Sequence, residues 1–100
     1  MLFAIIGFDH EGAAEKRAAN LKEHREHAAT IREQFAFGGP LQSDDDGRSV
    51  GSLIVADFPD RKAVENWLFK DPLYKAGVYK SIEIRRFQNR WPQKTGFVEA

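Results

Sequence analysis

The sequence contains no cysteine. This absence excludes disulfide bonds, a thiol nucleophile and metal sites built from thiolates. The sequence has a Gly-x-Ser-x-Gly match at Gly47-Arg48-Ser49-Val50-Gly51, but it leads into an expected strand and not from a strand into a helix, so acyl transfer through a serine nucleophile elbow is not expected.

An excess of either charge is also missing, since Lys+Arg and Asp+Glu each number 15. A chain without net charge has no field that would attract nucleic acid or an anionic membrane. We therefore expect no nucleic-acid partner and no membrane partner. The expected partner is a small molecule or a second copy of the chain.

No apolar run is long enough to cross a membrane. The first run, Met1 to Phe8, reaches Asp9-His10-Glu11 after eight residues. It also lacks the basic segment that precedes the apolar part of a signal peptide. The run is typical of a buried strand, and the cytoplasm is the expected compartment.

The hydrophobic pattern predicts four strands and two helices. The expected strands are Leu2 to Phe8, Phe37 to Leu41, Val50 to Phe58 and Val78 to Phe87, and the expected helices are Ala13 to Phe35 and Asp60 to Lys70. The first and third strands are apolar on both faces, so they should be central. The second contains a proline and the fourth has one polar face, so both should be edge strands.

This order predicts a single α+β domain with the ferredoxin-like βαββαβ topology and a four-stranded antiparallel sheet. The domain should cover residues 1–88, and residues 89–100 should form a C-terminal tail. Two helices cover only one face of such a sheet, yet both central strands are apolar on both faces. A homodimer through the open sheet face would cover the second one.

The buried stripe of the long helix contains one titratable residue near its middle. The stripe is predicted to run through Ala14, Ala18, Leu21, Ala28, Ile31 and Phe35. His24 lies three residues after Leu21 and four before Ala28, and at about 100° per residue it falls within the stripe. Arg17 falls on the same line.

Asp71 is the expected partner of His24. It precedes Pro72, which restricts its backbone and ends the second helix. An imidazole whose tautomer is fixed by a carboxylate can act as a general acid or base near neutral pH. The alternatives are a buried histidine bonded to a backbone carbonyl and an aspartate with a solvated side chain.

Metal and nucleotide sites are weaker interpretations. His24 and His27 share one side of the helix and His10 lies upstream, but no His-Glu-x-x-His pattern accompanies them. The glycines of Gly38-Gly39-Pro40 match no phosphate-binding loop. We therefore expect no metal and no cofactor.

Several short motifs together resemble the YciI-like proteins of the dimeric α+β barrel superfamily, over residues 1 to 88. They are Glu15-Lys16-Arg17 followed by His24, Gly39-Pro40-Leu41, Asp45-Asp46-Gly47, Gly51-Ser52, and Asp71-Pro72 followed by Ala76-Gly77-Val78-Tyr79. The chain departs from the family pattern around the histidine. Leu21-Lys22 stand where an arginine–proline pair often precedes it, and Arg25 stands where a leucine usually follows.

The resemblance implies a ferredoxin-like dimer with a histidine–aspartate active site, which carries over to His24 and Asp71. It also implies small-molecule chemistry of the isomerase, lyase or dehydrohalogenase kind. The residues expected to bind the substrate are Arg17, Ser52, Gly39, Pro40 and Tyr79. The alternative function is a dimeric module that binds or senses a small ligand without catalysis.

Overall fold

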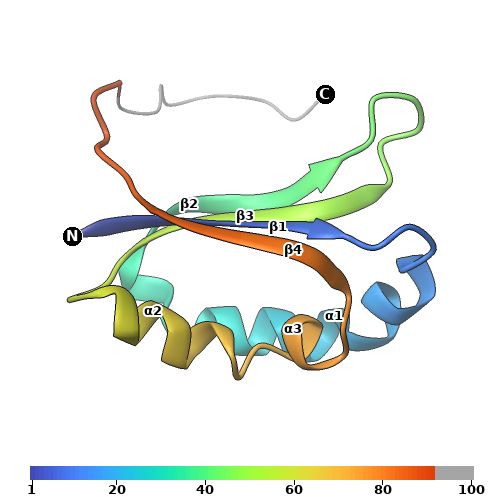
Figure 1. Cartoon of the computed structure of the whole chain (residues 1–100), viewed down its shortest axis with the longest axis horizontal. Helices are drawn as coiled ribbons and strands as arrows, with labels where there is room; N and C mark the ends of the chain where they lie inside the picture. Colours follow the sequence, from blue (N-terminus) through green and yellow to red (C-terminus); the bar gives the residue numbers. More distant parts are fainter. Residues whose placement is uncertain (92–100) are drawn as a thin grey trace.

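The computed structural model describes residues 1–91, and the expected tail lies outside the described residues from residue 92 onward. One four-stranded antiparallel sheet carries all the α-helices on one of its faces (Figure 1). In chain order, the elements are β1 (Leu2–Asp9), α1 (Ala14–Ala29), the 3₁₀ turn η1 (Arg32–Gln34), β2 (Phe35–Gln42), β3 (Ser49–Asp57), α2 (Arg61–Leu68), α3 (Pro72–Lys75) and β4 (Tyr79–Arg86). Within residues 1–91, no helix is long and apolar enough to cross a membrane.

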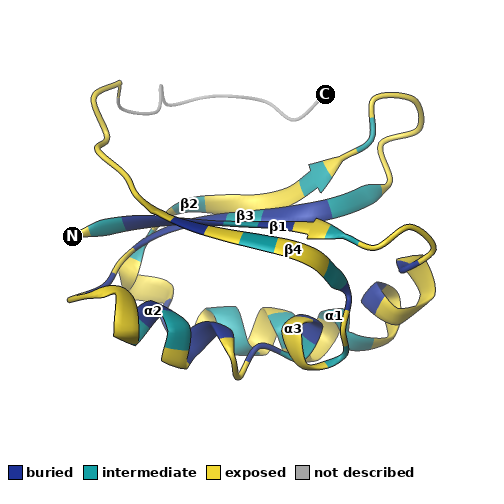
Figure 2. Cartoon of the chain, in the orientation of Figure 1, coloured by how far each residue is buried: buried dark blue, intermediate teal, exposed yellow. Residues whose placement is uncertain are grey.

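The sheet has the strand order β2-β3-β1-β4, so the predicted α+β class and ferredoxin-like topology are confirmed. β1 and β3 are central and β2 and β4 are the edges, as their hydrophobicity predicts. The burial pattern agrees, because the two central strands are mostly buried and the two outer strands mostly exposed (Figure 2).

The long helix is shorter than predicted. α1 ends at Ala29, and the chain makes a 3₁₀ turn before Phe35 enters β2. The hydroxyl of Thr30 donates to the carbonyl of His27 at 2.6 Å, and the backbone N–H of Thr30 bonds the same carbonyl in place of a regular helical bond. A threonine that satisfies the last carbonyls locally favours the end of a helix.

The first half of the predicted stripe on α1 was also wrong. Ala14 and Ala18 are exposed, whereas Ala13 and Arg17, one position earlier, are buried. Arg17 is buried as its spacing from Leu21 predicts, and Ala13 rather than Ala14 is the buried residue one turn before it. From Leu21 to Ile31 the stripe lies on the sheet side as expected.

Asp71-Pro72 both ends one helix and begins another. α2 begins after Asp60, whose carboxylate caps the helix by accepting the N–H of Ala63 at 2.8 Å. After α2, the Asp71 carboxylate accepts the N–H of Leu73 at 3.2 Å and so caps the four-residue α3, which the sequence analysis did not predict. Pro72 at the first helical position is favourable because its missing N–H would have no partner there.

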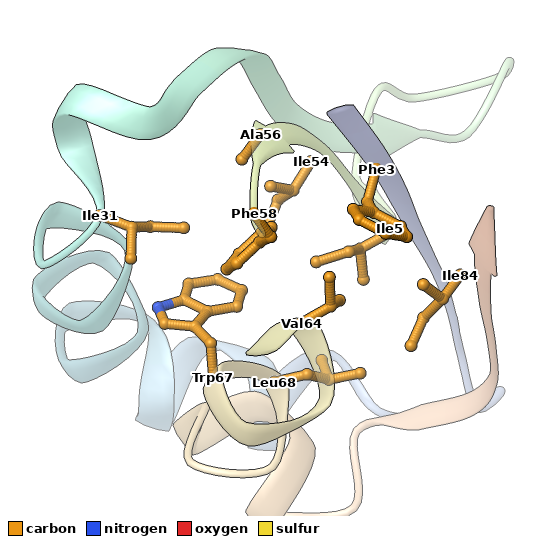
Figure 3. Close-up of a cluster of buried hydrophobic side chains, with 10 residues drawn as sticks. All are labelled: Phe3, Ile5, Ile31, Ile54, Ala56, Phe58, Val64, Trp67, Leu68 and Ile84. Carbon is orange, nitrogen blue, oxygen red and sulfur yellow. The ribbon is translucent and has the colours of Figure 1, made fainter. Parts of the chain in front are cut away.

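The main core lies between α2 and the sheet (Figure 3). Its buried members are Phe3, Ile5, Ile31, Ile54, Ala56, Phe58, Val64, Trp67, Leu68 and Ile84. A second, smaller cluster of Ala13, Leu73 and Val78 joins the start of α1 to α3. Arg17, Ser52 and Asp71 are polar or charged residues that are buried as well.

Candidate active site

A cleft of about 240 Å³ opens between α1 and the strands β2 and β3. Its lining residues are Arg17, Leu21, His24, Arg25, Ala28, Phe35, Gly38, Gly39, Pro40, Ser49, Ser52 and Ile54. A larger hollow of about 410 Å³ shares Gly38, Gly39 and Pro40, but its other lining residues include no histidine, acid or base. Of these two hollows, only the first is therefore lined by a residue, His24, that can act as an acid or a base.

His24 and Asp71 are in hydrogen-bonding contact, with 2.7 Å between Nδ1 and Oδ1. Asp71 is 1% exposed, and its carboxylate oxygen is held by the N–H of Leu73 as well. Because an ionised carboxylate can only accept, Nδ1 of a neutral His24 must carry the ring proton. Nε2 is then the nitrogen with a free lone pair, on a side chain that lines the cleft.

Arg17 forms a buried ion pair with Asp9. Its Nε donates to Asp9 Oδ2 at 2.7 Å and its Nη2 to Oδ1 at 3.0 Å, and both side chains are 6% exposed. Burial lowers the pKa of Arg17, but the hydrogen bond and the charge of Asp9 outweigh it, so the pKa is raised above its ordinary value. Arg17 therefore stays charged, with its charge balanced by Asp9.

Ser52 is held by two donors. Nη2 of Arg17 and the hydroxyl of Tyr79 each donate to its Oγ, both at 2.9 Å. These two bonds occupy both lone pairs of the oxygen. The Ser52 hydroxyl hydrogen is therefore left as a donor, on a residue that lines the cleft.

Tyr79 reaches Ser52 across a position without a side chain. A Cβ added at Gly7 would lie 2.7 Å from the Tyr79 ring, so only glycine leaves room for the ring on β1. Burial raises the pKa of Tyr79 above its ordinary value of 10.0, against the opposing effect of the hydrogen bond to Ser52. Tyr79 therefore remains a protonated donor at neutral pH.

The structure divides the seven predicted site residues into two groups, those that line the cleft and those that lie behind it. Arg17, His24, Gly39, Pro40 and Ser52 line it. Asp71 and Tyr79 do not, and they contact lining residues from behind, around a small cavity of about 10 Å³. Strict alternation with Ile82 and Ile84 predicts Tyr79 on the polar face of the last strand, and this is wrong, because a register shift between Phe8 and Asp9 turns Tyr79 toward the helices.

Sequence reasoning missed two charged residues of this region. Asp9 was not among the predicted site residues, although its place at the end of a buried apolar run could have drawn attention to it. Arg25 follows His24 on α1 and lines the same cleft. Its departure from the family pattern was the available signal.

The three histidines do not come together. His27 lies on the neighbouring side of α1, where Nε2 is 2.7 Å from the carbonyl of Trp67 and the two rings stack with centroids 4.7 Å apart. His10 lines a separate hollow beside the first turn of α1. In residues 1–91, no three histidine or acidic side chains are grouped as a metal site would require.

Comparison with known sequences agrees with the family resemblance seen in the short motifs. The profile of the YCII-related domain matches residues 1–88. The protein YciI of Escherichia coli O6:H1 is 27% identical over 95 residues, which cover 88% of this chain and 97% of that protein. An uncharacterised protein of Haemophilus influenzae is 26% identical over the same shares of the two chains.

Among solved structures, the fold is similar to that of TftG, the 5-chloro-2-hydroxyhydroquinone dehydrochlorinase of Burkholderia phenoliruptrix AC1100, in its complex with 2,5-dihydroxybenzoquinone. The TM-score is 0.85 at 24% identity, and the match covers 88% of this chain and 94% of that one. At this level of identity, the similarity concerns the fold.

Proposed function

This chain belongs to the family of proteins with a YCII-related domain, and from that premise we propose that it is a small-molecule enzyme in which His24 transfers a proton. The observation that carries the proposal is the 2.7 Å contact between His24 Nδ1 and the buried carboxylate of Asp71. It leaves Nε2 as a base on the wall of a cleft. A positioned base of this kind contributes a factor of about 10² to 10⁴ to the rate.

The cleft has the size of a one-ring substrate. A cavity of about 150 Å³ is enough to bind benzene, and the cleft offers about 240 Å³. Leu21, Ala28 and Ile54 supply apolar surface for such a ring, and Gly39 and Pro40 of β2 close the opposite wall. This shape supports a small cyclic or conjugated substrate.

The proposed step is a proton abstraction by Nε2 from an activated carbon or hydroxyl of the substrate. The electron pair released forms a new double bond. In an elimination, a leaving group such as chloride departs with its bonding electrons, and in an isomerisation, the imidazolium returns the proton to a different atom. Asp71 holds the ring in the reactive tautomer and stabilises its positive charge without touching the substrate.

Ser52 is the proposed donor to the oxygen on which negative charge develops. Arg17 and Tyr79 saturate its lone pairs and so fix the direction of its hydroxyl hydrogen. A donor that is already oriented stabilises a developing oxyanion without reorganisation. TftG, whose name describes removal of hydrogen chloride from a hydroxylated ring, provides a precedent for elimination on this fold.

The test is replacement of His24 by alanine, with turnover measured on 5-chloro-2-hydroxyhydroquinone and on panels of enols, lactones and other halogenated phenols. Formation of chloride or of the isomerised product should fall by a factor of about 10² to 10⁴. His10→Ala is the matched control, because His10 is exposed and does not line the cleft. Full activity of His24→Ala would contradict the proposal, and thermal stabilisation by ligands without any product would favour a binding module.

We also propose that the chain forms a homodimer through the sheet face that carries no helix. Ile6, Phe8 and Leu53 lie on this face, and Phe8 is 45% exposed. Apolar surface left in water costs about 25 cal/mol per Å², which favours a second copy as its cover. Light scattering after gel filtration should give twice the chain mass of 11.4 kDa, and a monomer at micromolar concentration would contradict the dimer.

A further inference from the structure

The lining of the cleft contains one arginine that has no ion pair among residues 1–91. Arg17 lines it, but its charge is balanced by Asp9. Arg25 lines it too, and within residues 1–91 it has no ion pair and no side-chain hydrogen bond. No aspartate or glutamate is among the residues that line the cleft.

The surroundings of Arg25 on α1 leave it without an acidic neighbour. The positions three and four residues away hold Leu21, Lys22, Ala28 and Ala29, so no intrahelical ion pair can form. The chain as a whole has equal numbers of acidic and basic residues. The positive charge of Arg25 beside a lining without acids is therefore a property of this cleft and not of the whole protein. The charge that would neutralise Arg25 is therefore expected on the ligand.

We propose that Arg25 is an anion-recognition residue, and that the cleft selects one-ring substrates carrying a carboxylate or a comparably acidic oxygen. The planar guanidinium can bind such a group through two parallel hydrogen bonds. One oxygen of the ligand then meets Arg25 at the exposed edge of the cleft, and another meets the hydroxyl hydrogen of Ser52 at the buried end. This inference deepens the proposed function and rests on it in taking the cleft as the substrate site.

The apolar lining explains why recognition would depend on a single charge. Leu21, Ala28, Phe35 and Ile54 can hold a ring but cannot distinguish an acid from its neutral ester. Among the other charged or titratable residues of the lining, Arg17 is paired with Asp9 and His24 bonds Asp71. Arg25 is the lining residue whose positive charge can distinguish the acid from its ester.

The experiment measures binding of paired probes by calorimetry or ligand-observed NMR. The probes are 2,5-dihydroxybenzoate, benzoate and 2-hydroxybenzoate, each compared with its methyl ester. The wild-type chain should bind each acid more tightly than its ester. Arg25→Leu, which restores the residue usual in the family, should weaken binding of the acids about three- to tenfold and leave the esters unchanged.

Two further variants separate charge from structure. Arg32→Leu is the matched control, because Arg32 is exposed and does not line the cleft, and it should bind every probe as the wild type does. Arg25→Lys keeps the charge without the fork and should retain part of the preference for acids. Added salt should weaken binding of the acids by the wild type more than by Arg25→Leu.

The outcomes separate this inference from the proposed function. Binding of acids and esters with equal affinity, no binding of any acid at millimolar concentration, or the same loss in Arg25→Leu and Arg32→Leu would overturn the role of Arg25. His24→Ala should retain the preference for acids, because it removes the base and leaves Arg25. A protein that selects acids through Arg25 but turns over no substrate would refute the enzymatic proposal alone.

Discussion

On the helix-covered face of the sheet, the same two central strands carry different side chains at their two ends. At one end, Phe3 and Ile5 of β1 lie opposite Ala56 and Ile54 of β3, and α2 packs over them (Figure 3). At the other end, Gly7 lies opposite Ser52. Two residues beyond Ile5 on β1 the chain has a glycine, and two residues from Ile54 on β3 it has the hydroxyl of Ser52.

The two ends of this face therefore differ in what they contribute to the protein. The apolar end removes hydrocarbon from water, and we expect it to supply most of the stability. At the polar end, the space left by Gly7 is occupied by Tyr79, and charged groups from β1, α1 and the start of α3 meet around Ser52. Burial there stabilises only because each charge has a partner.

Removal of Phe3 should have the largest effect on stability. Phe3→Ala leaves a cavity under α2 and should lower the free energy of unfolding by about 3–5 kcal/mol. The variant should still bind ligands normally while it is folded, because Phe3 does not line the cleft. Urea unfolding measures the first effect and ligand titration at low temperature the second.

The control for Phe3→Ala is Phe69→Ala, since Phe69 at the end of α2 is 49% exposed and contacts Tyr74 with ring centroids 5.2 Å apart. Its loss should cost about 1 kcal/mol at most. Equal losses for the two variants would mean that the apolar end is not the main source of stability.

The buried ion pair should give the next largest effect. Asp9→Ala leaves Arg17 buried and charged without its carboxylate, and the free energy of unfolding should fall by about 3 kcal/mol. Because Arg17 also orients Ser52, turnover should fall as well. Urea unfolding and steady-state kinetics measure the two effects.

A double variant tests whether this loss comes from the stranded charge. Asp9→Leu combined with Arg17→Met replaces both partners by apolar groups, and its stability should return to within about 1 kcal/mol of the wild type. Its activity should remain low, because Ser52 has lost a donor. A double variant as unstable as Asp9→Ala would show that shape rather than charge pairing holds this end together.

The two ends also differ in how far the sequence predicts them. The apolar end follows from alternation, since the runs from Leu2 to Phe8 and from Val50 to Phe58 indicate central strands. His24 could be placed on the sheet side of α1 by its spacing from Leu21 and Ala28. These inferences succeed because the regular geometry of helices and strands converts spacing directly into direction.

The polar end depends on irregular features that spacing does not encode. The register shift between Phe8 and Asp9 turns Tyr79 toward the helices, against simple alternation. α3 is only four residues long, so Asp71-Pro72 was read as a helix end although Asp71 also caps α3. The bond between Arg17 and Asp9 spans a loop whose path the residue types do not determine.

The smallest effect should come from the hydroxyl of Tyr79. Tyr79→Phe keeps the ring beside Gly7 and removes one donor to Ser52, which should cost about 1 kcal/mol of stability at neutral pH.

The stability cost of Tyr79→Phe should depend on pH. Burial raises the pKa of Tyr79 in the folded chain above the ordinary value of 10.0 that the unfolded chain keeps, so the folded state holds this proton to a higher pH. The stabilisation is therefore fully present below about pH 10 and declines as the pH rises toward the folded-state value. The phenylalanine variant has no such proton, and the difference in unfolding free energy between the two chains should narrow above that pH. Parallel urea titrations of both chains at neutral and alkaline pH measure this difference, in which the other titrating groups cancel. A constant gap would mean that Tyr79 contributes through the packing of its ring, which would make this edge of the polar end resemble the apolar one.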